Sequence, residues 1–560
     1  MDDSPSDGHL PRKRYPIAFP NEIIHEIFKW LDPTDITNLA CSCKTLSNNI
    51  NSDGQLFKAV YFQILVRADV PHADPLRSID YRGSMKSLVR FRHIFSSPNF
   101  EVAIAMSSIE YRTNILLFVE SFVTHLLRTA SAASQSKNLA LLKIHTTSSQ
   151  DATIMLGALL TQSKTCIRAD PICSDSLLNS GASWMSPSGC QASAKLNVLN
   201  GKPFLMEGDT LARTPFPCAS SMVFDLRNYT EENLWGPYID RLATADWEKL
   251  EASMVVLCHH AEDINDCIDR RMFPKGIMPE EGWEGAHPYS YKSVNLRGLD
   301  YDDDEEEDGQ AEFRDVAEKP SELHDPYNIT GTWVRVLCFL DFRELLEYNL
   351  ALPLLPNDEP WPAPQYVQMT YLFLMELHAT RGESMDTNDG QSYQIIYFQA
   401  VSRSVNSERN PNAPCNNKGS VRRTEEGEVR WETSSIFDGQ WRLRSEGIQI
   451  GGIQSARGVL GHWFIKERNQ HSGVGPIAFY KVSDQIKERV PLVEEVDSSE
   501  KEGETSDLDT DDDIDDIDDG DDSDDGGEVE EEEKREIGGC QHQPATGNSV
   551  DTMTAIERYF

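Results

Sequence analysis

The chain has 560 residues, of which 39% are hydrophobic, and a formal net charge of −40 at pH 7. A single hydrophobic core stops growing near about 250–300 residues, so this length predicts several domains. The negative charge is concentrated: residues 494–536 contain 25 Asp and Glu against three basic residues, and eight acidic residues lie within 300–308. Such runs repel themselves and phosphate backbones, which argues against a compact core in them and against nucleic-acid binding.

The eleven cysteines are scattered without a disulfide framework, which favours a reducing compartment. No apolar run approaches the ~18 residues of a membrane span, and the polar N-terminus lacks the core of a signal peptide. We therefore expect a protein of the cytoplasm, the nucleus or both, with no membrane partner. The basic triplet at residues 12–14 is a weak import signal and is more commonly a solvated flank.

Residues 16–66 carry two short apolar series at helical spacing, one from Ile24 to Leu31 and one from Ile36 to Ile50. Asp32-Pro33 separates them, because proline disfavours helix at the preceding residue, and Thr34 is the expected cap of the second helix. A third short helix is expected after Gly54. This segment is therefore predicted to be a small helical module.

Residues 88–130 predict core-forming helices, whereas 131–220 are rich in Ser, Ala and Pro and predict irregular structure. A short strand and a loop are expected from Met222, followed by a helix behind Asp246. From Thr330 the pattern changes to alternation, and several short strands separated by Gly-containing turns follow one another. Consecutive strands without helices between them favour a closed barrel or a sandwich.

Residues 19–63 read FPNEIIHEIFKWLDPTDITNLACSCKTLSNNINSDGQLFKAVYFQ. This string resembles the F-box, whose pattern begins Leu-Pro and continues with Glu-Ile, Ile-Phe and Leu-x-Pro-x-Asp-Leu. Phe19 replaces the opening leucine, and Leu46 stands where tryptophan is usual.

A second likeness lies downstream. Several strings resemble a group of fungal F-box proteins: GTW at 331–333, FLD at 339–341, EGEVRW at 426–431, the long string at 445–464 and GPIAF at 475–479, as well as residues 226–237 and 246–252. The two likenesses together cover the F-box and, separately, patches of residues 222–483. A more distant likeness is to animal F-box proteins that end in a β-barrel used as a substrate receptor.

The resemblance implies a substrate adaptor of an SCF-type cullin-RING ubiquitin ligase, without an active site or cofactor of its own. Its F-box docks on a Skp-type adaptor, which bridges to the cullin and RING subunits, and its C-terminal β domain presents a protein substrate for proteasomal degradation. The competing interpretation of the same helices is that they pack on residues 88–130. The docking residues that the resemblance implies are Phe19, Pro20, Ile23, Ile24, Ile27, Phe28, Leu31, Pro33, Ile36, Leu39 and Leu46.

No catalytic or metal constellation stands out in the sequence. Cys258, His259 and His260 are followed by Asp263 and Cys267, but neighbouring histidines on a helix point about 100° apart and no second ligand pair has zinc spacing. The Gly-rich string at 446–461 has no nucleotide-binding pattern and lies among predicted strands. We therefore predict no metal and no cofactor.

Arginines and tryptophans gather in the β region, and guanidinium groups match carboxylate or phosphate oxygens. This set is a candidate substrate site, and the competing interpretation is a barrel closed by tryptophans with solvated arginines. A lipocalin-like small-molecule sensor and a scaffold outside the ligase are the alternative functions; a filled interior argues against the sensor. The candidate substrate residues are Arg403, Arg430, Trp431, Arg442, Arg444 and Trp463.

The predicted fold class is a multidomain α+β chain. It combines an N-terminal three-helix F-box, a helical and irregular middle region, a C-terminal antiparallel β-barrel-like domain and a disordered acidic tail. The expected parts are a disordered lead at 1–15, the F-box at 16–66, the middle region at 67–220, a strand plus helix at 221–270, an acidic linker at 271–325, the barrel-like domain at 326–484 and the tail at 485–560.

Overall fold

The computed structural model describes sixteen stretches of the chain. The expected lead at 1–15 and both acidic runs lie outside them. The described residues are 20–52, 54–65, 80–97, 107–130, 136–147, 149–167, 185–201, 215–260, 282–291, 325–350, 362–366, 368–386, 392–404, 415–437, 440–465 and 473–486.

The N-terminal module contains the helices α1 (Asn21–Phe28), α2 (Pro33–Ser42), α3 (Lys44–Ser52) and α4 (Gly54–Ile64). The apolar series from Ile36 to Ile50 is divided between α2 and α3, because Cys43 has an extended backbone with φ −159° and ψ 157°. The prediction that Thr34 caps α2 was wrong. Asp32 is the cap instead, and its Oδ1 accepts a 2.9 Å hydrogen bond from the Thr34 backbone amide.

The described stretches of the middle region are mainly helical, so the prediction of irregular structure for 131–220 was wrong for the residues that the structure describes there. The small residues of α12, such as Ala192 and Ala194, are buried all round the helix, which removes the polar face that a periodic pattern needs. The helices of this region are α5 (Tyr81–Ser96), α7 (Ile109–Arg128), α8 (Lys137–Thr147), α9 (Gln150–Leu160), α10 (Lys164–Ile167), α12 (Pro187–Asn200) and α13 (Pro215–Phe224).

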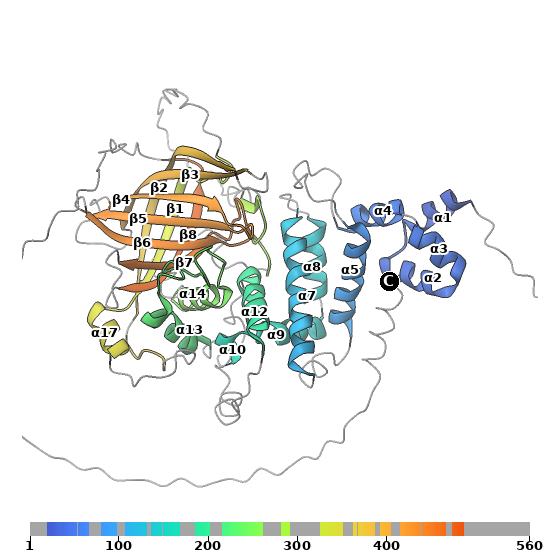
Figure 1. The fold of residues 1–560 in the computed structure, drawn as a ribbon, viewed down its shortest axis with the longest axis horizontal. Coiled ribbons are helices and arrows are strands. Elements are labelled where there is room, and N and C mark those ends of the chain that lie inside the picture. The colour runs from blue at the N-terminus through green and yellow to red at the C-terminus, as the bar shows by residue number, and fades with distance from the viewer. Residues whose placement is uncertain are drawn as a thin grey trace, which may run out of the picture. The chain divides into compact units, whose positions relative to one another are not determined.

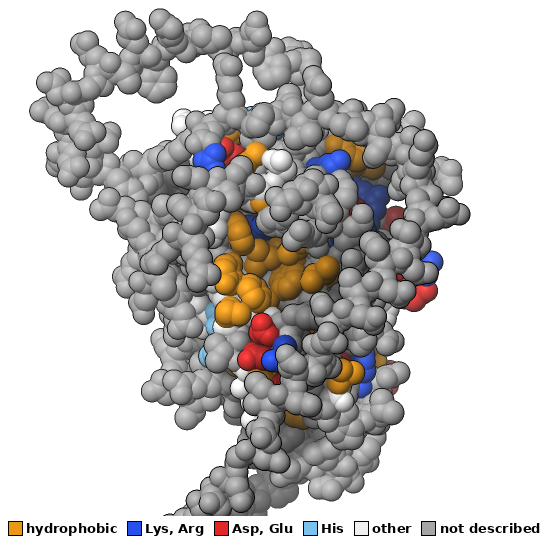
Figure 2. Space-filling model, turned by 90° about the vertical axis from the view of Figure 1, so that its left-hand side faces the viewer, with side chains coloured by type: hydrophobic (Ala, Val, Ile, Leu, Met, Phe, Trp, Pro, Cys, Tyr) orange, Lys and Arg blue, Asp and Glu red, His pale blue; other side chains and the backbone are white. Residues whose placement is uncertain are grey.

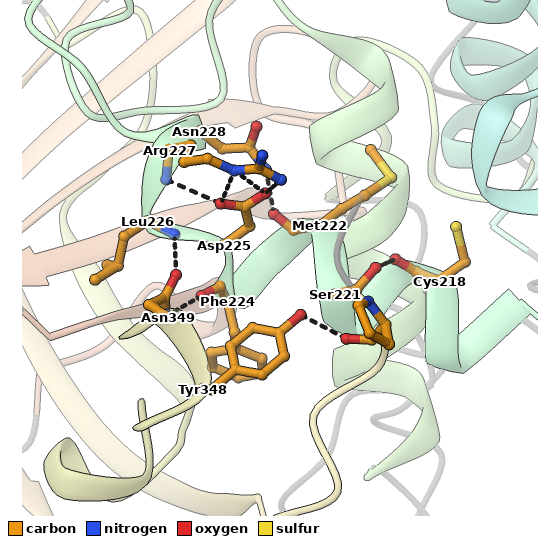
Figure 3. Close-up of polar contacts among 11 residues, drawn as sticks. Cys218, Ser221, Met222, Phe224, Asp225, Leu226, Arg227, Asn228, Tyr348 and Asn349 are labelled. Carbon is orange, nitrogen blue, oxygen red and sulfur yellow. Dashed lines mark hydrogen bonds and ion pairs between the residues drawn. The ribbon is translucent and has the colours of Figure 1, made fainter. Parts of the chain in front are cut away.

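The strand expected from Met222 is absent from the described residues 215–260, since that stretch ends α13 and leads into a 3-10 turn at Leu226–Asn228. Asn349, in α17 (Phe342–Leu350), holds this turn from the side. Its Oδ1 accepts from the Leu226 amide at 3.0 Å and its Nδ2 donates to the Phe224 carbonyl at 3.1 Å (Figure 3). Asp225 and Arg227 pair beside it at 2.8 Å. The chain then runs through turns into α14 (Trp247–His259).

Eight antiparallel strands form a closed barrel, in which each strand pairs with the next and β8 pairs with β1 (Figure 1). The predicted α+β fold class, with a helical front and a β-barrel-like C-terminal domain, is confirmed. Closure leaves no unpaired sheet edge. The strands are β1 (Gly331–Phe339), β2 (Met369–Asp386), β3 (Ser392–Ser404), β4 (Cys415–Arg423), β5 (Val429–Phe437), β6 (Gln440–Gln449), β7 (Val459–Ile465) and β8 (Val474–Ser483).

Part of the barrel's outer wall is buried as deeply as its interior. Helix α14 packs on β1, β7 and β8, and α13 packs on β8 (Figure 1). The outward-facing Val334 and Val336 of β1 are therefore only 6% and 4% exposed. A strand covered on both faces reads as an apolar run, which explains why the string TWVRVLCF is apolar apart from Thr332 and Arg335.

Candidate functional site

The N-terminal module uses one face of α1 for its own core. Ile24 and Phe28 are buried on that face, where the chain also buries Ile36 and Leu46. Asp32, between α1 and α2, forms a 2.5 Å ion pair with Arg92 of α5. These contacts fix α1 against the following helices, so its exposed side can be presented as a rigid surface.

The side of α1 next to its buried face carries exposed apolar residues. Ile23 is 46% exposed, Ile27 49% and Trp30, just after the helix, 71%. Their spacing of four and three residues places them in one row. We call Ile23, Ile27 and Trp30 the α1 stripe. Large apolar groups in a row, rather than scattered singly, are typical of a surface that another chain covers.

The expected docking residues fall into three groups in the structure. Pro20, Ile23 and Ile27 are exposed, and Leu31 and Leu39 are half-buried. Phe19 lies outside the described residues. The rest are core residues of the module, so a partner reaches them only if the module changes: Ile24, Phe28, Pro33, Ile36 and Leu46.

Trp30 was missed in the sequence, although its spacing from Ile23 and Ile27 was a readable signal. Fully burying one large apolar side chain contributes about 1.5–3 kcal/mol, so completing the burial of the half-exposed α1 stripe yields only about 3–6 kcal/mol. Association costs about 4–15 kcal/mol, so the stripe alone does not hold a partner. A stable complex needs further surface, and Pro20, Leu31 and Leu39 are the apolar candidates next to it.

The arginines predicted to form a substrate row on the barrel are already paired with acids. Arg430 lies on the outer wall and donates through Nε and Nη2 to the two carboxylate oxygens of Glu446, at 2.9 and 2.8 Å. Burial alone would lower the pKa of Arg430, but the hydrogen bond and charge of Glu446 outweigh it and raise that pKa. Arg444 pairs with Glu432 at 2.6 Å. Both guanidinium groups therefore already contact a carboxylate of the same chain, and their role in substrate binding stays a prediction.

The remaining members of that set are dispersed. Trp431 and Trp463 point into the barrel, where Trp431 is 1% exposed and Trp463 donates from Nε1 to the Cys338 carbonyl at 3.0 Å. A side chain at Gly475 would approach Trp463 Nε1 to 2.7 Å, so this packing requires glycine. Arg403 is half-buried, and the Arg442 side chain lies outside the described part.

One end of the barrel interior is filled by aromatic side chains. Trp333 lies 4.9 Å from Trp431 between ring centroids, and Phe398 lies 5.7 Å from Trp431. Phe479 stacks on the same ring, with the two ring centroids 6.4 Å apart. All four side chains are at most 2% exposed. This end is a packed core, which argues against a deep lipocalin-like cavity there.

The other part of the interior holds a charge. Arg335 of β1 points inward between Trp333 and Leu337 and is 1% exposed. Its Nη1 donates to Asn417 Oδ1 at 3.2 Å and to Ser435 Oγ at 3.1 Å. These acceptors belong to β4 and β5, which do not neighbour β1, so the side chain crosses the barrel. The alternation that predicts this strand is carried by Val334 and Val336 on its other side, so it gives no signal for Arg335.

The histidine and cysteine cluster does not form a metal site in the described residues. Cys258 is buried, His259 stacks on Phe216 at 3.7 Å, and His260 forms a 2.9 Å hydrogen bond with Gln368 Oε1. Asp263 and Cys267 lie outside the described residues. Across the described part, no group of three His, Cys, Asp or Glu side chains is placed to hold a metal ion.

Comparison with known protein families identifies an F-box-like domain at residues 18–63. This match coincides with helices α1–α4 and implies that the chain binds a Skp-type adaptor. Comparison with curated proteins finds no match, and comparison with solved structures finds none either. Among the described helices, none has both the length and the apolar content of a membrane-spanning segment.

Proposed function

We propose that this chain is the substrate-recognition subunit of an SCF-type cullin-RING ubiquitin ligase. The observation that carries the proposal is the exposed α1 stripe within the F-box-like domain. The stripe, together with Pro20 and the half-buried Leu31 and Leu39, docks on the Skp-type adaptor. That adaptor links the chain to the cullin and RING subunits, and the chain has no catalytic step of its own.

The C-terminal barrel presents the protein substrate for ubiquitin-dependent degradation. Figure 2 faces the end of the barrel at which β5 and β7 end and shows an apolar patch there. Half-buried apolar side chains converge at this end, among them Phe339, Phe373, Leu443 and Ile465. Because the arginines of the outer wall are paired, this end is the better candidate for substrate contact. The setting of the complex is the cytoplasm, the nucleus or both.

Co-purification of the full chain with a Skp-type adaptor tests the docking. The double variant Ile23→Asp, Ile27→Asp is expected to abolish adaptor binding, since it places two charges in the stripe without removing a buried residue. The matched control is Ile154→Asp in α9, because Ile154 is 42% exposed and lies outside the F-box-like domain. Binding that survives the double variant, or that wild type never shows, contradicts the proposal.

Substrates are sought by affinity purification with the cullin inhibited, because substrates then accumulate on their receptor. Proteins recovered with both wild type and the α1 double variant are candidates, since the barrel is unchanged in both. The same proteins are expected to rise in abundance when the chain is depleted. If no recovered protein is stabilised by depletion, the chain acts outside the ligase, as a scaffold.

A further inference from the structure

The charge of Arg335 lacks a counter-ion in the described part of the barrel. Its two hydrogen bonds go to a neutral amide oxygen and a neutral hydroxyl, and its Nε is buried without a hydrogen-bond partner. Burial lowers the pKa of Arg335 to about 10, so the group still carries its charge near neutral pH. An isolated buried cation is strongly destabilising unless an anion accompanies it.

Uncharged polar groups surround the guanidinium inside the barrel. Asn417 Nδ2 donates to Ser402 Oγ at 2.9 Å, and Ser435 Oγ donates to Asn417 Oδ1 at 2.6 Å. Thr433 and Ser445, whose hydroxyls lie 2.5 Å apart, are also buried. Hydroxyl and guanidinium donors together suit an anion's oxygens.

The side chains beyond this polar region are apolar. The ring of Phe373 lies 4.7 Å from the guanidinium carbon of Arg335, and it is half-buried. Phe339, Leu443 and Ile465 are half-buried at the same end of the barrel. From Arg335 to Phe339 the strand covers roughly 13 Å. A ligand that reaches the charge from this end therefore needs an anionic head and an apolar body of medium length.

We propose that Arg335 anchors an interior site for a small apolar carboxylic acid, with the carboxylate on the guanidinium and the apolar body among Phe339, Leu443 and Ile465. Two carboxylate oxygens match the donor fork of an arginine. Phe373 covers the guanidinium in this structure, and its ring turns aside when the acid enters. The site does not depend on adaptor docking, so failure of either leaves the other untouched.

Thermal unfolding of the full chain tests this site, with decanoate as the probe and 1-decanol as the uncharged match. The barrel transition is followed by tryptophan fluorescence, since Trp333, Trp431 and Trp463 line the interior. Decanoate, below its micellar concentration and at a hundredfold excess over Kd, is expected to raise the Tm by roughly 5 °C. Decanol is expected to leave it unchanged. Equal shifts with both compounds, or none with decanoate, overturn the proposal.

Two variants assign the effect to the charge. Arg335→Met is expected to fold with an equal or higher Tm, because it removes a buried unpaired charge, and to lose the decanoate shift. Arg444→Met, which removes a partly exposed and paired arginine, is expected to keep the shift. If Arg335→Met does not fold, Phe373→Ala decides: uncovering the guanidinium increases the decanoate shift, and an unchanged or smaller shift overturns the proposal.

Discussion

The outer wall and the interior of the barrel differ in the partners that they provide for buried arginines. On the wall, Arg430 donates through Nε and Nη2 to the two carboxylate oxygens of Glu446. Tyr238 donates to the same carboxylate at 3.1 Å. In the interior, Arg335 has only neutral partners among the described residues. A buried arginine paired with a carboxylate stabilises the fold, whereas one without an acidic partner can still bind an anionic ligand. Whether a buried arginine has an acidic partner therefore separates structural from functional charges here, and the abundance of arginine and tryptophan does not.

The largest effect is expected from breaking the wall pair. Glu446→Gln leaves Arg430 buried without its counter-charge and is expected to lower the free energy of unfolding by about 3–5 kcal/mol. Removing both charges with Arg430→Met, Glu446→Leu is expected to restore much of this loss, because well-packed apolar groups replace a buried pair at little cost. Urea denaturation of the single and double variants measures the coupling.

If Glu446→Gln is as stable as wild type, then Arg430 is compensated elsewhere. The nearest other carboxylate is that of Glu432, whose Oε2 lies 3.8 Å from Arg430 Nη2. Loss of a carboxylate partner would then be tolerated on the wall as it is in the interior, and Arg335 would not be unusual in this barrel.

The sequence predicts those parts of the molecule that depend on neighbours along the chain. The F-box-like segment is recognisable because its helices are short and its core residues lie close together. The barrel is recognisable because its strands follow one another along the chain, although helix α17 lies between β1 and β2, where the sequence predicted no helix. Arg335 is not, because its partners Asn417 and Ser435 lie 82 and 100 residues away across a closed barrel.

The burial of Leu46 shows the same limit in the F-box-like domain. Spacing places it on the apolar side of a helix, but only the packed structure shows that this side faces the module's own core, where Leu46 is 6% exposed. Ile23 and Ile27 have the same apolar character and lie outside that core. Composition and spacing therefore find the domain, and packing decides which of its residues a partner can reach.

A buried acid that has no cationic partner among the described residues provides the counterpart of Arg335. Glu251 of α14 is fully buried, accepts from Ser163 Oγ at 3.0 Å and from the Asn197 amide, and its Oε2 lacks a hydrogen-bond partner. Burial raises the pKa of Glu251 to about 8, with a smaller contribution from the nearby Glu248. The folded protein therefore keeps a proton there that the unfolded chain, ionising near its usual value, gives up.

Stability is expected to fall as pH rises between those two pKa values, because only the unfolded chain gains from ionisation. From about pH 5.5 to about 7.5 wild type should lose roughly 3 kcal/mol relative to Glu251→Gln, whose amide resembles the neutral acid. Urea denaturation of both proteins at the two pH values measures the difference. Parallel pH profiles for the two proteins would mean that Glu251 is ionised in the fold.

The smallest effect is expected at the exposed pair on the same wall. Arg444 and Glu432 are separated by 2.6 Å, but their side chains are 26% and 32% exposed, so water already screens both charges. Glu432→Gln is expected to change the free energy of unfolding by less than about 1 kcal/mol, and added salt should narrow even that difference. The variant matches Glu446→Gln in chemistry and differs from it in burial. The two carboxylates lie on neighbouring strands and each contacts an arginine. If both variants lose the same free energy of unfolding, burial does not determine how much each ion pair stabilises the fold.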